Sequence, residues 1–275
     1  MNAPKRPVLR YHGGKWRLAP WVIEHFPPHS MYVEPFGGAA SVLLQKPRIG
    51  AEVYNDLDGG VVNVFRVMRN AGQARQLAAL LTLTPFSREE FLGAYDDADC
   101  PVEQARRTII RAFMGQSANA ATRRAKNGFR SKRAGCSGSP AVDWTSYPAQ
   151  IPAFIERLRG VVIEHVDALD LIARYDGEST LFFVDPPYVT STRTNGYTSY
   201  AHEMTDADHE ALAERLHAVS GMVVLSGYDS PLYRRLYPNW PVFRRKVMAD
   251  RAASRTECLY LSPRTSKVQR RSLCA

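Results

Sequence analysis

The stretch LFFVDPPY, residues 181–188, joins an apolar strand to a polar turn. Four apolar residues bounded by a turn indicate a buried strand, which ends at Asp185, Pro186, Pro187 and Tyr188. The carboxylate and a neighbouring proline carbonyl are two acceptors that can hold both hydrogens of an exocyclic amine and free its nitrogen lone pair for attack. The tyrosine ring offers a face on which a planar base taken out of a duplex can stack. A stiff Pro-Pro turn that only terminates the strand is the simpler alternative.

A second strand-to-turn corner lies upstream, in the stretch YVEPFGGA at residues 32–39. Gly37 and Gly38 let the backbone approach a ligand closely, and a helix predicted to begin over residues 39–45 would present free N–H groups. Asp56 follows the next predicted strand, 18 residues beyond Gly38. At about 20 residues from such glycines, a carboxylate commonly accepts hydrogen bonds from the ribose hydroxyls of a nucleotide. A tight turn and a helix N-cap would explain the same residues without any ligand.

Strands and helices alternate along most of the chain. We predict strands at residues 31–36, 51–55, 161–165, 181–184, 222–226 and 258–262, with a weaker one at 242–247. Helices are predicted at residues 61–69 and 205–220, the second with Thr205 as N-cap and Asp208 placed as in a capping box. This alternation predicts βαβ units and a mainly parallel sheet of the α/β class.

The middle of the chain breaks this pattern. No strand is predicted from about residue 71 to residue 159, and residues 105–135 hold nine basic side chains and no acidic one. Residues 134–140 are rich in Gly, Ser and Pro and are predicted as loop. We therefore divide the chain into one domain formed by residues 1–70 and 159–275 and an inserted segment, residues 71–158, with its own surface and partner.

Composition narrows the class of protein further. The chain has 275 residues and a formal net charge of +9, a balance that suits a polyanion such as nucleic acid. No apolar run approaches the ~20 residues needed to cross a bilayer, and no signal core follows Met1, so we expect a cytoplasmic protein without membrane contact. The four cysteines are scattered and no HExxH spacing occurs, so neither a disulfide framework nor a metal site is expected. The oligomeric state stays open.

Four motifs stand in order along the chain: RYHGGK at residues 10–15, EPFGG at 34–38, Asn55-Asp56, and DPPY at 185–188. With the basic insertion placed before DPPY, the chain resembles, over nearly its whole length, the Dam-type (D12 class) DNA adenine-N6 methyltransferases. The resemblance implies a Rossmann-like, three-layer αβα sheet that binds S-adenosylmethionine (SAM), with an inserted, mainly helical target-recognition domain. It implies site-specific methyl transfer from SAM to N6 of a flipped-out adenine in double-stranded DNA, with no metal required.

The resemblance also implies roles for individual residues. Asp56 would hold the ribose hydroxyls of SAM, and Asp167 would meet its adenine amine. Asp185 and Pro186, in the turn completed by Pro187, would hold the target amine, with Tyr188 stacked on the target base. The residues expected to contact SAM are Tyr11, Gly14, Lys15, Glu34, Phe36, Gly37, Gly38, Asp56, Asp167, Ala168 and Asp185.

The basic insertion would supply the DNA contacts. Arginine and lysine neutralise phosphates, and arginine and asparagine can also contact base edges in the major groove. Two further stretches, residues 226–229 and 255–257, either line the target pocket or are plain loops at strand ends. The residues expected to bind DNA are Arg111, Asn119, Arg123, Arg124, Asn127, Arg130 and Lys132.

Other functions compete with this interpretation. The nearest is methylation of another amine, namely cytosine N4, RNA adenine or a protein glutamine. The basic insertion favours DNA over protein, and Asp185 at the first position of its motif favours adenine over cytosine. A DNA-binding relative that has lost catalysis is opposed by the intact Lys15, Asp56 and Asp185. A nicotinamide dehydrogenase is disfavoured because the third glycine of the GxGxxG pattern is missing.

Overall fold

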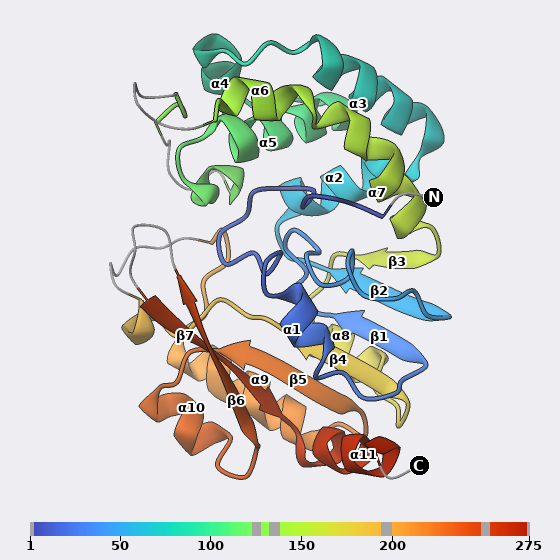
Figure 1. The fold of residues 1–275 in the computed structure, drawn as a ribbon, viewed down its shortest axis with the longest axis vertical. Coiled ribbons are helices and arrows are strands. Elements are labelled where there is room, and N and C mark those ends of the chain that lie inside the picture. Colours follow the sequence, from blue (N-terminus) through green and yellow to red (C-terminus); the bar gives the residue numbers. More distant parts are fainter. Residues whose placement is uncertain (1–2, 123–127, 132–137, 194–199, 249–253, 274–275) are drawn as a thin grey trace.

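The computed structural model describes residues 3–122, 128–131, 138–193, 200–248 and 254–273. Within these residues, seven strands form one sheet in the order β3-β2-β1-β4-β5-β7-β6 (Figure 1). The strands are β1 (Met31–Glu34), β2 (Ala51–Asn55), β3 (Val161–Glu164), β4 (Thr180–Val184), β5 (Met222–Gly227), β6 (Val242–Met248) and β7 (Ser254–Leu261).

Strands β1 to β5 run parallel to one another, whereas β7 is antiparallel to both β5 and β6. The prediction of a mainly parallel sheet is confirmed, and the antiparallel pair at one edge was not predicted. Only residues 249–253 separate β6 from β7, and this connection is too short for the crossover that parallel neighbours require. Strands β4 and β5 are buried along their whole length, which explains their uninterrupted apolar sequences.

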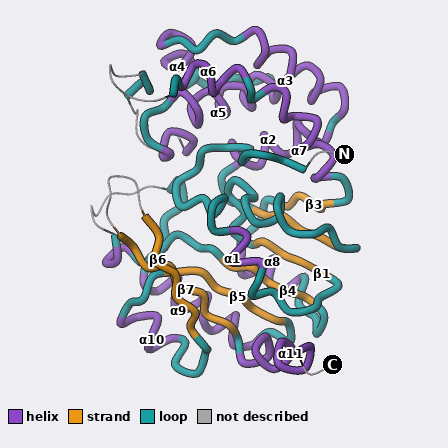
Figure 2. Tube along the Cα trace, in the orientation of Figure 1, coloured by secondary structure: helices purple, strands orange, loops and turns teal. Residues whose placement is uncertain are grey.

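Helices cover both faces of the sheet and give three layers (Figure 2). Leucines on α9 share a buried cluster with Val184 and Leu225 of the sheet. Val22 of α1 and Phe65 of α2 belong to the cluster on the opposite face. The helices of one face are α8 (Ala168–Arg174), α9 (Asp206–Ala218) and α10 (Pro231–Leu236), and those of the other are α1 (Ala19–Ile23), α2 (Gly59–Arg69) and α11 (Pro263–Leu273).

The described residues between α2 and β3 are mostly helical and lie at the β3 end of the sheet (Figure 1). Helix α2 packs against both α3 and α5, and one buried cluster extends from Tyr54 through Phe65 to Ile109 and Trp144. The middle of the chain therefore shares its core with the sheet. Its elements are α3 (Ala71–Leu83), α4 (Arg88–Gly93), α5 (Pro101–Met114), η1 (Ala118–Thr122), α6 (Pro140–Thr145), η2 (Pro148–Gln150) and α7 (Ile151–Leu158).

One predicted helix is wrong. Residues 39–45 form hydrogen-bonded turns, with bonds from Ala40 N to Gly37 O and from Leu44 N to Ala40 O. Gly38 and Ala40 have positive φ angles of 49° and 53°, outside the helical region, so the chain cannot continue directly into a helix. The predicted capping box of α9 is confirmed, because Thr205 and Asp208 exchange side-chain to backbone hydrogen bonds.

Buried charges join the middle of the chain to the sheet. Glu52 on β2 is 3% exposed and pairs with Lys46, at 2.6 Å between Nζ and Oε1. The same carboxylate pairs with Arg157 of α7, at 2.6 Å between Nη1 and Oε2, and Nη2 donates to Oε1 at 2.9 Å. One carboxylate thus neutralises two cations that are themselves largely buried.

Replacing Glu52 should therefore be costly. We expect Glu52→Gln to lower the free energy of unfolding by about 3–5 kcal/mol, because it leaves two buried cations without their anion. The matched control is Glu178→Gln, whose side chain is 82% exposed and pairs with Arg264; it should cost at most about 1 kcal/mol. Urea unfolding followed by circular dichroism measures both, and equal losses in the two variants would contradict the role of Glu52.

Candidate active site

A cavity of about 450 Å³ lies at the carboxyl ends of β1 and β4, where the strand order reverses direction. Open α/β sheets bind ligands at this point, and the volume is in the range that holds a nucleotide-sized molecule. Every residue predicted to contact the cofactor lines it. These are Tyr11, Gly14, Lys15, Glu34, Phe36, Gly37, Gly38, Asp56, Asp167, Ala168 and Asp185.

The corner after β1 requires glycine for two separate reasons. A Cβ at Gly37 would lie 2.2 Å from the ring of Tyr54, so no side chain fits there. Gly38 has a φ of 49°, and its N–H donates to Asp56 Oδ2 at 2.8 Å. The Tyr54 hydroxyl donates to the Gly38 carbonyl at 2.7 Å. The corner is thereby fixed against β2, with its backbone exposed to the cavity.

Asn55 and Asp56 make different contacts. The Asn55 side chain, which is fully buried, donates to the carbonyls of Pro35 and Val166 and accepts from the N–H of Val166, so it ties three loops together. Asp56 accepts at Oδ1 from the N–H of Asp58, and the cap of α2 is Asp58. The N-cap explanation considered for Asp56 is therefore wrong. Desolvation at the cavity floor raises the pKa of Asp56 to about 6.

Glu34 is a buried carboxylate at the end of β1. It is 2% exposed, and its Oε1 accepts from the Tyr32 hydroxyl at 2.6 Å and from the N–H of Leu43 at 2.8 Å. Burial raises the pKa of Glu34 to about 7, although both hydrogen bonds favour the ionised form. Glu34 lines the cavity, and both of these hydrogen bonds go to the same carboxylate oxygen, Oε1.

Lys15 and Asp185 both line the cavity and form an ion pair, at 3.0 Å between Nζ and Oδ1. Lys15 Nζ also donates to the Gly13 carbonyl at 3.0 Å. Burial alone would lower the pKa of Lys15, but the Asp185 and Glu257 carboxylates outweigh it and the net shift is upward. Burial raises the pKa of Asp185, and Lys15 opposes that shift. The pair connects the RYHGGK loop to the DPPY turn.

The DPPY turn differs in part from the prediction. Asp185 and Pro187 line the cavity, whereas Pro186 and Tyr188 are absent from the described residues around it. Tyr188 is 9% exposed, and Lys15 Nζ lies over its ring, 4.7 Å from the centroid. The face of the ring that Lys15 covers is therefore not open for base stacking in this structure.

Two residues singled out at strand ends hold the Tyr188 hydroxyl. Ser226 Oγ on β5 lies 2.7 Å from it, and Glu257 Oε2 on β7 accepts from it at 2.8 Å. Both side chains are buried. Both residues lie within strands rather than loops, and neither is among the described residues that line the cavity, so lining of the target pocket stays a prediction.

One wall of the cavity was missed by the sequence analysis. Tyr200, His202, Glu203 and Met204 line it from the connection between β4 and α9. Polar and aromatic residues in a loop that follows a strand at this edge are a usable signal, because such loops surround the ligand in α/β proteins.

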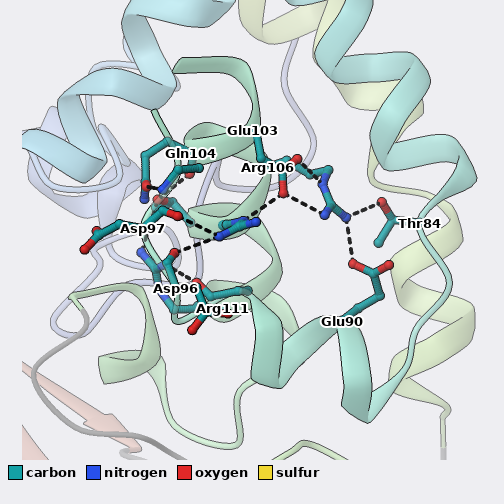
Figure 3. A network of polar contacts seen from close by, with 12 residues as sticks. Thr84, Glu90, Asp96, Asp97, Glu103, Gln104, Arg106 and Arg111 are labelled. Carbon is teal, nitrogen blue, oxygen red and sulfur yellow. Dashed lines mark hydrogen bonds and ion pairs between the residues drawn. The ribbon is translucent and has the colours of Figure 1, made fainter. Parts of the chain in front are cut away.

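The basic side chains of α5 are engaged within the protein (Figure 3). Arg106 pairs with Glu90 and Glu103, each at 2.7 Å, and Arg107 pairs with Glu103 at 2.8 Å. Arg111 is fully buried, donates to the Ala94 carbonyl and contacts Thr108. Arg111 is therefore withdrawn from the residues expected to bind DNA, because a fully buried guanidinium cannot reach phosphate.

The other residues expected to bind DNA follow α5 in the sequence. Arg130 is half-buried, and its N–H donates to the Met114 carbonyl at 2.7 Å, next to a bridge between Gly115 and Phe129. Asn119 lies within η1. The remaining predicted residues, Arg123, Arg124, Asn127 and Lys132, lie outside the described residues.

No helix among the described residues is long and apolar enough to cross a membrane. No group of three or more His, Cys, Asp or Glu side chains is arranged to hold a metal ion among those residues.

A mostly parallel α/β sheet with a glycine corner, a carboxylate after the second strand and a DPPY turn around one cavity is consistent with a methyltransferase fold. The family model of the D12 class N6 adenine-specific DNA methyltransferases matches residues 11–252, and the chain belongs to this family.

Three relatives align with this chain over about nine-tenths of its length. A DNA adenine methylase of Serratia marcescens is 24% identical over 263 residues, covering 91% of this chain and 93% of the relative. A DNA adenine methylase of Vibrio cholerae serotype O1 is 25% identical over 260 residues, covering 91% of each. The type II methyltransferase M.MjaIII of Methanocaldococcus jannaschii is 25% identical over 274 residues, covering 90% and 92%.

The raised pKa of Glu34 predicts a pH dependence of stability in the ligand-free protein. The folded state holds this proton up to about pH 7, whereas the ordinary pKa is 4.5, so the free energy of unfolding should fall as the pH rises between these values. Glu34→Gln should remove that part of the slope, a few kcal/mol at most at about 1.4 kcal/mol per pKa unit. Urea unfolding between pH 4.5 and pH 8 measures it.

Asp56 contributes to the slope in the same direction up to about pH 6, so the comparison of interest is between wild type and Glu34→Gln. Identical slopes in the two proteins would show that Glu34 titrates normally.

Proposed function

We propose that this protein transfers a methyl group from SAM to N6 of adenine at specific sites in double-stranded DNA, in the cytoplasm. The observation that carries the proposal is a cavity at the switch point of the sheet whose lining includes all of the predicted cofactor-binding residues, Asp185 among them. Family membership supports the adenine specificity.

The donor set of the cavity fits SAM. Lys15, Glu34 and Asp185 place charged groups at one end, and the backbone of Gly37 and Gly38 lies beside them. Ser41 also lines this cavity, and its buried Oγ has no hydrogen-bond partner among the residues that the structure describes. Such an atom normally has a partner, so a polar ligand group would complete it.

Different residues of the chain would then bind different parts of SAM. The carboxylate of Glu34 is placed to hold the ammonium group of the methionine part, and Asp56 the ribose hydroxyls. Asp167, which caps α8 through Leu169 N, would meet the adenine amine. When bound, SAM supplies an activated methyl group on a sulfonium.

Asp185 would accept hydrogen bonds from the target amine. Its charge is balanced by Lys15, so the turn can be held at the cavity without an unpaired buried anion. Positioning the amine for in-line attack is the main requirement, since the methyl donor is already reactive. The Tyr188 hydroxyl, anchored by Ser226 and Glu257, fixes the end of the same turn.

DNA would be held by the middle of the chain. Arg106 and Arg107 of α5 pair with carboxylates and Arg111 is fully buried, so we assign the contacts to residues 119–132. We propose Asn119, Arg123, Arg124, Asn127, Arg130 and Lys132 for this role.

Asp185→Asn tests the catalytic assignment. We expect turnover to fall by at least about a hundredfold, as when a single positioned polar group is lost from an active site, while the circular dichroism spectrum stays that of wild type. The control Asp170→Asn changes an exposed carboxylate on α8 and should be neutral. Methyl transfer from labelled SAM to DNA is the readout, and full activity of Asp185→Asn would sink the proposed site.

The reaction itself is tested by single-molecule sequencing of DNA from a methylation-deficient bacterial host that expresses the protein, beside the Asp185→Asn variant. We expect N6-methyladenine in one sequence context with the wild type only. Soluble protein without any modified adenine would redirect the search to other amines or to a non-catalytic DNA-binding role.

Arg123→Ala and Arg130→Ala test the DNA surface. Each should weaken DNA binding at low salt and reduce the slope of log K against log salt by about one, because each phosphate contact releases counterions. Arg174→Ala is the control, since this arginine on α8 is half-exposed and pairs with Glu164. Unchanged affinity and slope would place both tested arginines away from the DNA.

A further inference from the structure

Arg193 holds the end of the catalytic turn. It follows η3 (Thr190–Thr192), five residues after Tyr188, and its side chain is 11% exposed. Its Nε donates to the Tyr188 carbonyl at 2.9 Å, and Nη2 donates to the same oxygen. Two donors of one guanidinium thus fix a single backbone atom directly after the Asp-Pro-Pro sequence.

The same guanidinium also contacts the cavity wall that the sequence analysis missed. Nη1 pairs with Glu203 Oε2 at 2.8 Å, and Glu203 Oε1 accepts from the N–H of Tyr200 at 2.9 Å. The guanidinium carbon lies over the Tyr200 ring, 5.4 Å from its centroid. Arginine suits this position because its rigid fork can make contacts in several directions at once, which a lysine ammonium cannot reproduce.

Tyr200 carries the contacts to the far side of the cavity. Its hydroxyl occupies the space beside Gly13, only 2.4 Å from where a Cβ would stand, and Gly13 has a φ of 71°. The His12 ring packs edge-on against Tyr200 at 5.3 Å. Because the Gly13 carbonyl accepts from Lys15, and Lys15 pairs with Asp185, the contacts close a ring around the cavity.

We propose that Arg193 is a positioning residue that couples occupancy of the cofactor cavity to the geometry of the DPPY turn. A cofactor that packs against Tyr200 and Glu203 fixes their positions, and Arg193 transmits this to the Tyr188 carbonyl. Arg193 does not line the cavity among the described residues, so it acts through Tyr188 and Glu203. The inference rests on the proposed function, since it takes SAM as the occupant.

The test uses Arg193→Ala, Arg193→Lys and Glu203→Gln in the full chain. We expect Arg193→Ala to weaken SAM binding severalfold in calorimetry and to lower kcat by about tenfold to a hundredfold, the cost of a small misplacement of reacting groups. Arg193→Lys keeps the charge without the fork and should recover SAM binding more than kcat. At saturating SAM, the double variant Arg193→Ala/Glu203→Gln should lower kcat no further than Arg193→Ala does, because the two residues act on the turn as one unit.

Hydrogen–deuterium exchange gives a readout that does not depend on turnover. In the wild type, SAM should slow exchange both at residues 200–204 and at the turn around Tyr188. In Arg193→Ala, measured at a SAM concentration that saturates the variant, SAM should still slow exchange at residues 200–204. It should no longer slow exchange at the turn around Tyr188. Arg174→Ala, an exposed arginine on α8, should behave as wild type.

The outcomes separate the two proposals. Protection of the turn that persists in Arg193→Ala, or losses that add fully in the double variant, would overturn the coupling while leaving methyl transfer in place. If Arg193→Ala does not fold, the comparison of Arg193→Lys with wild type decides by the same exchange pattern. A wild-type protein that binds no SAM would instead overturn the proposed function.

Discussion

The ion pair between Lys15 and Asp185 is the contact on which the site depends. It lies in the lining of the cavity, at 3.0 Å between Nζ and Oδ1, and joins the loop before α1 to the end of β4, two segments 170 residues apart in the chain. An anion in this poorly solvated position is tolerated because a cation lies beside it, and the cation is tolerated for the same reason. The glycine corner, Glu34 and the Tyr188 turn are arranged around this pair, so its two charges set the electrostatic character of the whole pocket.

The strand order places these groups together. The strand order reverses between β1 and β4, which are parallel to each other. The loops after these two strands therefore leave on opposite faces of the sheet and open a space between them. Asn55 keeps that space defined by tying the corner after β1 to the loop after β3. A cavity at this point is thus a product of topology, and the side chains give it chemical specificity.

Much of this arrangement could be predicted from the sequence. Strand β4, the glycine corner and Asp56 are local patterns whose physical cause lies within a few residues, and they were placed correctly. The burial of Arg111 could not be read from its neighbours, since Arg107 one turn earlier on the same helix pairs with a carboxylate, and only packing against the end of α4 places Arg111 inside. The helix predicted after Gly38 failed because a left-handed backbone at Ala40 carries no sequence signature. Tyr200 and Arg193 were missed because their contacts join distant loops.

The triad of Glu52, Lys46 and Arg157 has a consequence for the relative motion of the sheet and the helical middle of the chain. It fastens α7, at the end of the helical middle, to a central part of the sheet, and the two regions share one apolar interior. The helical region consequently cannot swing as an independent arm. The distance between the helical middle of the chain and the cavity is therefore set by buried packing and buried charge.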